Sequence, residues 1–484
     1  MVNFSILIED IDEVYVSVLA ERGILQELSE RFEFYAQNYK YMKRYKESNW
    51  DGKIRLFSPF RRMLYKGLVD EVYKFAEEKG YEVFYEPEER PEVDFKAYLD
   101  SKEKKFEPYD YQYDCIEKVL NNRRHTIVSP TGSGKSYIIY WISRFLSDHK
   151  KNVLIVVPTV SLVHQIYSDF EDYSIGWDVE KKCHKIYQGQ DKSIRKRVTI
   201  TTWQSIYKLQ RKWFDGIDCV IADECHMYKS NELTQIVEKC KNAEWKTGLT
   251  GTLDDIYMHE LTLTGLFGPT LKNVSSKELM ERDILSKLKI NLVGLKYKND
   301  ICRKIVNWKN YQKEIDFLVK HEPRNKFIKN LCQALNGNTL VLFQYVDKHG
   351  KKLYDMLSKI EGKTVFFVHG KVSPEEREKV RRTVSERNDV IIVASYGTFS
   401  TGINAPALHN LVIASPTKSK VRILQSIGRG LRKSENKTHC RVFDIFDVLV
   451  YNDNMSYSMK HSDSRIVYYT NEKFDVESHS YDLF

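Results

Sequence analysis

Short apolar runs that alternate with helical patterns constrain the fold of this chain more than any other feature. Five runs between residues 124 and 250 are rich in Val, Ile and Thr, have strand length and end in turn or polar residues. They are HTIVS (125–129), NVLIVVP (152–158), RVTITT (197–202), DCVIAD (218–223) and WKTGLT (245–250). Strands separated by helices predict a parallel sheet with helices on both faces.

A second series with the same pattern follows. Its runs lie at 287–295, 338–344, 363–370, 389–395 and 410–415. The sequence therefore predicts an α/β fold with two tandem doubly wound parallel-sheet domains after a small N-terminal α+β domain. We place the domains at 1–105, 106–280 and 281–450, with a C-terminal extension at 451–484.

Composition narrows the function class only slightly. The 484 residues include eight scattered cysteines without a C-x-x-C pair, which predicts free thiols and no zinc site. The first residues are acidic, and no apolar run approaches the ~20 residues of a membrane span, so we expect a cytoplasmic protein without a membrane partner. A net charge of +9 is compatible with a polyanionic partner but does not require one.

The stretch SPTGSGKS, residues 129–136, resembles a phosphate-binding loop whose first glycine is replaced by Ser129. A strand can lead into it and a helix can follow, which favours a phosphate site over a chance glycine turn. We expect Lys135 to reach the β- and γ-phosphates of a nucleotide and Ser136 to ligate Mg²⁺. The residues expected to surround the phosphates are Pro130, Thr131, Gly132, Ser133, Gly134, Lys135 and Ser136.

The stretch IADECH, residues 221–226, delivers two adjacent carboxylates at the end of an apolar run. We expect Asp223 to hold Mg²⁺ and Glu224 to position or deprotonate the attacking water. The alternative is a solvated acidic turn, which the phosphate loop upstream makes less favourable.

Positive charge for the far side of a γ-phosphate is available in QSIGRGLRK, residues 425–433. Arg429 and Arg432 lie about one helical turn apart, Gln425 precedes them, and a guanidinium can bind two phosphate oxygens at once. The alternative is a basic surface helix. If these arginines face the nucleotide from the second domain, ATP binding and hydrolysis drive a motor.

Taken together, these motifs resemble those of superfamily two helicases. The set also includes VVPTVSLVHQ (156–165), TTWQS (201–205), TGT (250–252) and ASYGTFSTGIN (394–404), in the order typical of the superfamily. The resemblance implies two RecA-like domains that use ATP and Mg²⁺, and it adds Gln112 and Gly402 as nucleotide contacts. Two departures are TGT, where SAT is commoner, and Ser129.

The resemblance also places nucleic-acid contacts in small polar residues that grip the phosphodiester backbone. These candidates are Thr159, Gln165, Thr202, Gln204 and Thr401. Each of them could equally be an ordinary cap or turn residue.

Residues 40–66 concentrate positive charge, with nine Lys/Arg, two acids and six aromatics. Basic groups neutralise phosphates and aromatic rings stack on exposed bases. The candidate contacts are Lys43, Arg44, Trp50, Arg61 and Arg62. The alternative is a hairpin with a solvated basic edge, and Asp51-Gly52 is a strong turn signal for such a hairpin.

The N-terminal part, with NWDGKIRLF at 49–57, resembles the bacteriophage UvsW helicase family. This resemblance implies an ATP-dependent DNA helicase of recombination, repair and replication restart with 3′–5′ polarity. Its expected substrates are forks, Holliday junctions, D-loops and RNA–DNA hybrids, and its expected partners are branched DNA and single-stranded DNA. We expect a monomer that meets recombination or single-strand-binding proteins, in the host cytoplasm if the chain is viral.

Three alternatives remain open from the residues alone. A double-stranded DNA translocase or an RNA helicase would use the same motor, and a non-catalytic nucleic-acid scaffold would retain only the fold. Intact Lys135, Glu224 and Arg432 argue against the scaffold.

Overall fold

The computed structural model describes residues 5–36, 39–228, 231–253, 256–398, 407–433, 437 and 439–484. Two compact units separate within the chain. The first unit contains Met1–Ser129 and Gly134–Asn273, and the second contains Pro130–Ser133 and Val274–Phe484.

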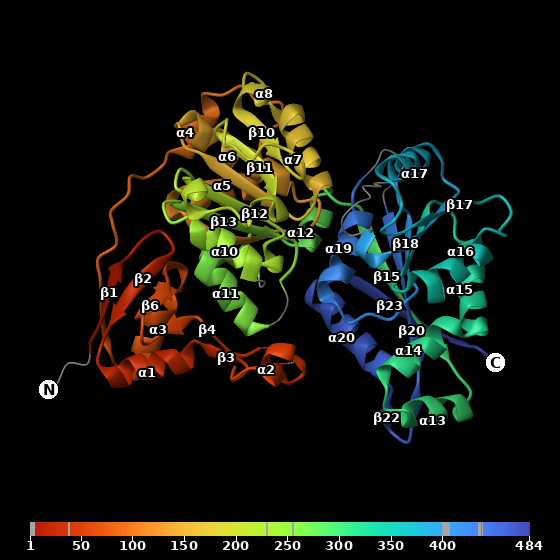
Figure 1. Cartoon of the computed structure of the whole chain (residues 1–484). Coiled ribbons are helices and arrows are strands. Elements are labelled where there is room, and N and C mark those ends of the chain that lie inside the picture. The colour runs from red at the N-terminus through yellow and green to blue at the C-terminus, as the bar shows by residue number, and fades with distance from the viewer. Residues whose placement is uncertain are drawn as a thin grey trace. The chain divides into compact units, whose positions relative to one another are not determined.

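The first unit begins with a five-stranded mixed sheet in the order β5-β6-β2-β1-β7. Alternating Ile6 and Ile8 on β1 and Val16 and Val18 on β2 bury one face of this sheet against α1 and α3 (Figure 1). The strands are β1 (Ser5–Asp10), β2 (Tyr15–Leu19), β5 (Phe57–Ser58), β6 (Met63–Tyr65) and β7 (Glu82–Tyr85). The helices are α1 (Arg22–Arg31), η2 (Lys66–Leu68) and α3 (Val69–Lys79).

The expected hairpin with its turn at Asp51-Gly52 is wrong. Only β4 (Lys53–Arg55) forms a strand there, and it pairs with β3 (Glu33–Tyr35), far back in the sequence. The connection holds η1 (Tyr39–Tyr41) and α2 (Lys43–Glu47). Asp51 accepts a hydrogen bond from Lys53 N at 3.0 Å, which is typical of an aspartate in a turn. The turn forms as predicted, but it precedes β4 and does not join two paired strands.

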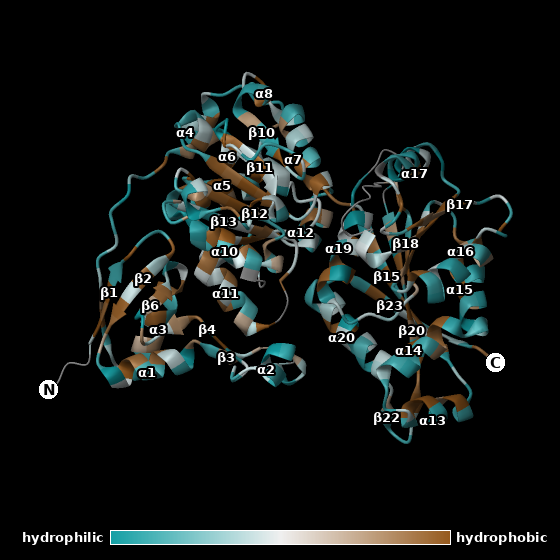
Figure 2. Cartoon of the chain, viewed as in Figure 1, coloured by the Kyte–Doolittle hydropathy of each residue, from teal (hydrophilic) through white to brown (hydrophobic). Residues whose placement is uncertain are grey.

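The rest of the first unit is a seven-stranded sheet in the order β10-β11-β9-β12-β13-β8-β14, in which every pairing is parallel. All five predicted runs form strands within it. The strands are β8 (Arg124–Val128), β9 (Val153–Val157), β10 (Cys183–Ile186), β11 (Val198–Thr202), β12 (Cys219–Asp223), β13 (Trp245–Thr250) and β14 (Thr270–Lys272). Figure 2 shows the apolar character of these central strands, which predicts burial on both faces.

Helices cover both faces of this sheet, as the alternating runs predict. One face packs on α5 (Asp110–Asn122), α6 (Lys135–Asp148) and α7 (Val160–Tyr173), and α4 (Phe95–Asp100) and α8 (Val179–Lys182) extend this layer. The other face packs on α9 (Trp203–Ile206), η3 (Arg211–Phe214), η4 (Cys225–Met227), α10 (Asn231–Lys239) and α11 (Tyr257–Phe267).

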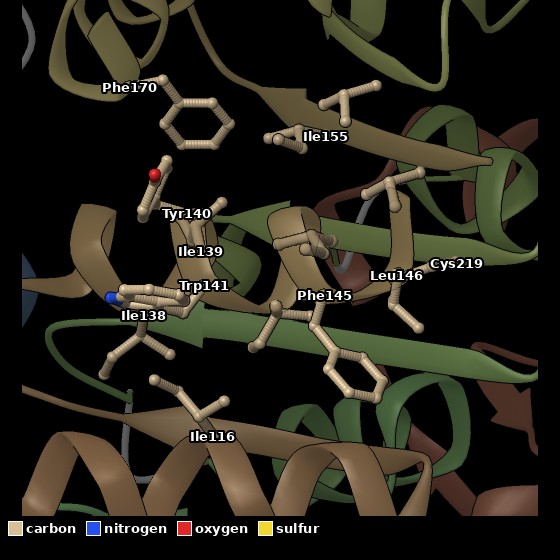
Figure 3. Close-up of a cluster of buried hydrophobic side chains, with 14 of the residues drawn as sticks. Ile116, Ile138, Ile139, Tyr140, Trp141, Phe145, Leu146, Ile155, Phe170 and Cys219 are labelled. Atoms are coloured by element: carbon tan, nitrogen blue, oxygen red, sulfur yellow. The ribbon is translucent and has the colours of Figure 1, made fainter. Parts of the chain in front are cut away.

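Helix α6 forms the centre of the larger core. Its side chains Ile138, Tyr140, Trp141 and Phe145 are buried among Phe170 and neighbouring aliphatic residues (Figure 3). Such packing fixes the helix that follows the phosphate loop. None of the helices in the described ranges is long and apolar enough to cross a membrane.

The second unit contains another all-parallel seven-stranded sheet, in the order β17-β18-β16-β19-β20-β15-β23. All five runs of the second series form strands, and two more strands complete the sheet. They are β15 (Lys287–Lys296), β16 (Thr339–Phe343), β17 (Thr364–Val368), β18 (Val390–Ser395), β19 (Asn410–Ile413), β20 (His439–Val448) and β23 (Asp475–Asp482). The last strand lies in residues 451–484, so the expected C-terminal extension supplies the sheet edge.

The helices of the second unit lie in the connections between its strands. One face of the sheet packs on α13, α14, α15 and α16, and α19 and α20 pack beside β19 and β20. The bounds are α12 (Ser276–Glu281), α13 (Asn299–Asn307), α14 (Tyr311–Lys320), α15 (Glu322–Ala334), η5 (Val346–Gly350), α16 (Lys351–Leu357), α17 (Pro374–Glu386), α19 (Lys420–Gly430) and α20 (Tyr457–Asn471). A short hairpin, β21 (Val450–Tyr451) and β22 (Asn454–Met455), precedes α20.

Two buried arginines hold the loop that leads into α19. Arg324 pairs with Asp447 on β20 at 2.8 Å and donates to the carbonyl of Ala414. Arg465 pairs with Asp444 at 2.8 Å and donates to the carbonyl of Thr417. Because buried charges are costly unless paired, these contacts fix the loop geometry strongly.

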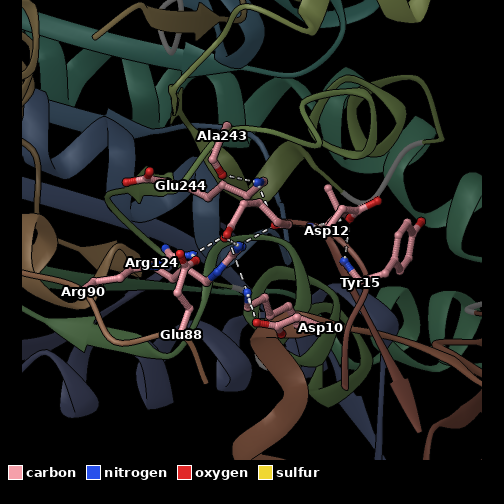
Figure 4. A network of polar contacts seen from close by, with 12 residues as sticks. Asp10, Asp12, Tyr15, Glu88, Arg90, Arg124, Ala243 and Glu244 are labelled. Carbon is pink, nitrogen blue, oxygen red and sulfur yellow. Dashed lines mark hydrogen bonds and ion pairs between the residues drawn. The ribbon is translucent and has the colours of Figure 1, made fainter. Parts of the chain in front are cut away.

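The N-terminal sheet docks on the seven-stranded sheet of the first unit through Glu13, in the β1–β2 loop. Figure 4 shows the polar network around Arg90 and Arg124 at this contact. The Glu13 carboxylate accepts from Arg124 at 2.8 Å and pairs with Arg90, and its backbone carbonyl accepts from the buried ammonium of Lys246 at 2.8 Å. Burial opposes ionisation of Glu13, but Arg124, Lys66 and Arg90 prevail and hold its pKa below the usual range.

A second contact lies beside this cluster. The hydroxyls of Tyr15 and Tyr65 both donate to Glu238 on α10, at 2.9 and 2.6 Å. The N-terminal sheet is therefore attached by charge-assisted hydrogen bonds at two points.

We predict that Glu13→Gln lowers the unfolding free energy of the chain by about 2 kcal/mol at pH 7, because it removes a carboxylate from a cationic pocket. The pKa of Glu13 is lowered by folding, so its contribution is present above the unfolded value of 4.5 and is lost as the pH falls through the folded value. Urea titrations at pH 7 and pH 3.5 measure the difference, with exposed Glu9→Gln as the matched control. An equal effect of Glu13→Gln at both pH values would contradict this role.

Candidate nucleotide and nucleic-acid sites

The segment 129–136 connects β8 directly to α6, as the sequence predicted. Gly132 and Gly134 have φ of +89° and +79°, a conformation that favours glycine. Ser129 is not among the residues with positive φ in the described chain. Its N–H donates to the carbonyl of Thr250 at 2.9 Å, so a serine meets the backbone requirement at the loop entrance.

Lys135 lies at the first position of α6 and folds back over the loop. Its ammonium donates to the carbonyl of Ser129 at 2.9 Å. A lysine held at a helix N-terminus beside left-handed glycines is the chemistry that a triphosphate requires, because backbone N–H groups and the ammonium share its negative charge.

Gln112 reaches the same loop from α5. Its side chain is buried, and its Oε1 accepts from Tyr109 N at 3.0 Å. A Cβ at Gly134 would lie 2.3 Å from Gln112 Nε2, so only glycine fits there. The structure thus brings Gln112 against Gly134, which is 22 residues away in the sequence.

Asp223 and Glu224 end β12, the strand beside β13 in the sheet centre. Burial and the charge of Glu224 raise the pKa of Asp223 to about 7, and the Lys135 ammonium opposes this shift. Glu224 adopts φ 52° and ψ 47°, a left-handed conformation that is uncommon outside glycine. Strained residues of this kind often occur at functional sites.

His226 lies between Glu224 and the TGT segment. His226 Nδ1 lies 3.3 Å from Glu224 Oε2 and 2.9 Å from Thr250 Oγ1. The Thr250 hydroxyl donates its proton to the carbonyl of Thr252, so it must accept in the contact with His226. We therefore place the ring proton of His226 on Nδ1. Changes at Thr250–Thr252 can therefore reach Glu224 through His226.

The residues fit a magnesium–nucleotide complex by their chemistry. Ser136 supplies a hydroxyl that lies 2.9 Å from the hydroxyl of Tyr173, and Asp223 supplies a carboxylate. Hard oxygen donors suit Mg²⁺, which completes its shell with phosphates and water.

In the second unit, Gln425 and Arg429 lie one turn apart on α19, and Arg432 follows the helix. All three are half-buried. Lys437, which the sequence analysis did not single out, donates its buried ammonium to the carbonyls of Gly430 and Arg432. Nothing in the sequence distinguishes Lys437 from its many neighbouring lysines, because only its burial gives it this role.

The candidates for nucleic-acid contact on the seven-stranded sheet of the first unit differ in solvent exposure. Gln165 and Gln204 are exposed, and Thr159 caps α7 through Leu162 N at 3.4 Å. Thr202 is only 4% exposed, and its hydroxyl lies 2.9 Å from that of Ser205, so its side chain has a structural role here. Thr401 and Gly402 lie outside the described residues.

The candidate nucleic-acid contacts of the N-terminal domain also differ in solvent exposure. Lys43, Arg44, Arg61 and Arg62 are exposed. Trp50 is half-buried, because its indole N–H donates to the carbonyl of Lys53 at 2.9 Å and the Arg44 guanidinium lies 5.1 Å from the ring centre.

Two other aromatic side chains in the basic segment are far more accessible than Trp50. Tyr41 is 79% exposed and Phe60 is 95% exposed. Tyr41 ends the short helix η1 and Phe60 lies in a turn, and the composition of the segment does not reveal these positions.

The paired all-parallel sheets, the phosphate loop and the acidic strand end define a superfamily two helicase. Three family models match in turn: DNA helicase UvsW, N-terminal, at residues 5–86; Type III restriction enzyme, res subunit, at 105–255; and Helicase conserved C-terminal domain at 323–434.

Two further comparisons identify the family. The chain is 34% identical to the ATP-dependent DNA helicase uvsW of Enterobacteria phage T4, over 96% of this chain and 97% of that protein. The crystal structure of T4 UvsW matches with a TM-score of 0.51 at 32% identity, over 99% of this chain and all of that one. The chain belongs to the UvsW helicase family and is an ATP-dependent DNA helicase.

A more distant relative is the DNA 3′-5′ translocase XPB2 of Sulfurisphaera tokodaii. It is 25% identical over 69% of this chain and 80% of its own length.

We predict that Lys135→Ala lowers kcat for ATP hydrolysis by at least about 10²-fold, because it removes a cation from the phosphates. DNA binding, measured by fluorescence anisotropy, should stay within about 2-fold. Exposed Lys192→Ala is the matched control and should hydrolyse ATP normally. If Lys135→Ala still hydrolyses ATP at the normal rate, Lys135 does not bind the phosphates.

Proposed function

We propose that this helicase unwinds or branch-migrates branched DNA and displaces RNA from R-loops, with 3′–5′ polarity, in recombination, repair and replication restart. The observation that carries the proposal is the similarity to the phage T4 helicase across the N-terminal domain as well as the motor. The XPB2 relative, a DNA 3′-5′ translocase, supports the polarity.

In the proposed mechanism the first helicase domain holds the nucleotide. Lys135 contacts the β- and γ-phosphates, the backbone of Pro130–Gly134 surrounds them, and Gln112 recognises the adenine. Ser136 and Asp223 would hold Mg²⁺, which neutralises charge that develops on the phosphates during transfer.

Glu224 orients the attacking water and accepts its proton. His226, which is hydrogen-bonded to Thr250 and lies 3.3 Å from Glu224, positions Glu224 for this step. Arg429 and Arg432 stabilise the charge on the γ-phosphate, with Gln425 and Gly402 as further nucleotide contacts. Lys437 positions the two arginines by holding the end of α19.

We further propose the functional division 1–105, 106–280 and 281–450, with residues 451–484 serving the second helicase domain. The continuous sheet formed by β15 and β23 supports the last assignment.

Nucleic acid would meet the exposed cations Lys43, Arg44, Arg61 and Arg62 and the polar residues Thr159, Gln165 and Gln204. So few DNA contacts are sufficient for branch migration, because the exchange of one duplex for another changes the free energy little. Opening a duplex without such exchange costs roughly 1.4 kcal/mol for each base-pair step.

A substrate panel tests the proposal directly. Strand displacement with ATP should be measured on DNA forks, Holliday junctions, R-loops, RNA duplexes, and plain duplexes with either a 3′ or a 5′ tail. We expect activity on the branched substrates and R-loops and a preference for the 3′ tail. Displacement of RNA duplexes alone would favour an RNA helicase, and triplex displacement without strand separation would favour a double-stranded DNA translocase.

We predict that Arg432→Ala slows ATP hydrolysis by about 10³-fold or more in saturating DNA, as expected for an arginine finger. Its neighbour Lys433 pairs with Asp283 at 2.7 Å, so Lys433→Ala is a matched control that should retain activity. If ATP hydrolysis by Arg432→Ala is only a few-fold slower, Arg432 is not an arginine finger and has a structural role.

A further inference from the structure

The turn between β5 and β6 presents Phe60 to solvent more fully than any other large hydrophobic side chain in the described part of the chain. Single exposed apolar residues are common on protein surfaces, so exposure alone assigns no role. The rigidity of this turn, its charge and its attachment to the motor domain together set Phe60 apart.

The Phe60 turn is held rigidly. Phe57 and Leu64, paired across the two strands, are both buried. Ser58 Oγ accepts from Arg61 N at 3.3 Å, and Arg62 closes the turn with φ 52°. The Arg62 carbonyl accepts from Val18 N at 2.8 Å, so the turn is also tied to the central strand of the sheet.

The chain on either side of Phe60 is basic. Residues 56–65 include no Asp or Glu, and Phe60 directly precedes Arg61 and Arg62. Within the described residues, ion pairs engage Lys53, Arg55 and Lys66 but neither of these two arginines. The cations beside Phe60 are therefore available to phosphates.

The base of the hairpin is braced against the first helicase domain. Tyr65, at the end of β6, donates to Glu238 on α10 at 2.6 Å and stacks on Tyr15 with ring centres 5.2 Å apart. Its ring also lies against Gly265 of α11. A force on the tip of the hairpin is thus resisted by the domain that carries the phosphate loop.

We propose that Phe60 is a strand-separating pin. Its ring stacks on the terminal base pair where a duplex branches, while Arg61 and Arg62 bind phosphates of the diverging strands. Every base offers a π-face, so the contact needs no sequence preference, and apolar wedges are known to unstack base steps. The inference rests on the proposed action on branched DNA and names the residue that would meet the branch point.

The test compares Phe60→Ala, Phe60→Leu and Phe60→Trp in the full-length protein. Each variant is measured for fork displacement, DNA-stimulated ATP hydrolysis and single-strand binding. We expect Phe60→Ala and Phe60→Leu to displace strands at least about 10-fold more slowly, with ATP hydrolysis and binding within about 2-fold. Phe60→Trp should restore displacement. Phe84, 53% exposed on β7 at the opposite edge of the same sheet, provides the matched control Phe84→Ala.

A second measurement is independent of unwinding. A fork with 2-aminopurine in the branch-point base pair should gain fluorescence when the wild type or Phe60→Trp binds without ATP, and should not when Phe60→Ala binds. Normal strand displacement by Phe60→Ala would contradict the proposal that Phe60 separates strands. The exposed ring would then be assigned to contact with a protein partner. Parallel loss of hydrolysis and binding, or rescue by leucine, would equally overturn the proposal. If the wild type separates no strands, the proposed function fails, and the fluorescence result still decides the pin.

Discussion

One carboxylate, Glu13, sets the geometry of the first unit. Arg124, which pairs with this carboxylate, and Lys246, which donates to the backbone carbonyl of Glu13, lie at the amino ends of β8 and β13. The carboxyl ends of these two strands carry the phosphate loop and the TGT segment. The N-terminal domain is therefore attached to the very strands that position the nucleotide chemistry, at the opposite edge of the sheet. Breaking a buried ion pair is costly, so we expect the N-terminal domain and the first helicase domain to move as one rigid body without a hinge between them.

The parallel sheet explains why distant motifs meet. Strands β8, β12 and β13 are close in sheet order, so Ser129, Asp223 and Thr250 all emerge at one edge. The hydrogen bonds from Ser129 N to the Thr250 carbonyl and from His226 Nδ1 to the Thr250 hydroxyl then join three motifs that are separate in the sequence. Ligand sites of open parallel sheets lie outside this carboxyl edge, which agrees with the placement of Lys135 and Glu224.

The sequence predicted the two sheets because their central strands are apolar on both faces. It predicted the edge strand β17 but missed the edge strands β10, β14 and β23. The burial pattern of β23 shows the reason: this strand is largely polar, since one side of an edge strand faces solvent. Sequence reasoning also missed β20, whose buried Asp444 and Asp447 interrupt the apolar pattern and are tolerated only because Arg465 and Arg324 pair with them. The phosphate loop could be predicted because its spacing is local. The roles of Lys437 and Phe60 depend on burial and turn geometry, which no local pattern encodes.

The claim that the N-terminal domain and the first helicase domain move as one body can be measured by distances between spin labels. Exposed Glu77 on α3 and Asp172 on α7 offer labelling sites after substitution by cysteine, and all eight native cysteines are buried. The account predicts one narrow distance distribution that is unchanged by a non-hydrolysable ATP analogue and forked DNA. A second distance population, or a shift when nucleotide binds, would show that the N-terminal domain swings on the motor and would contradict the account.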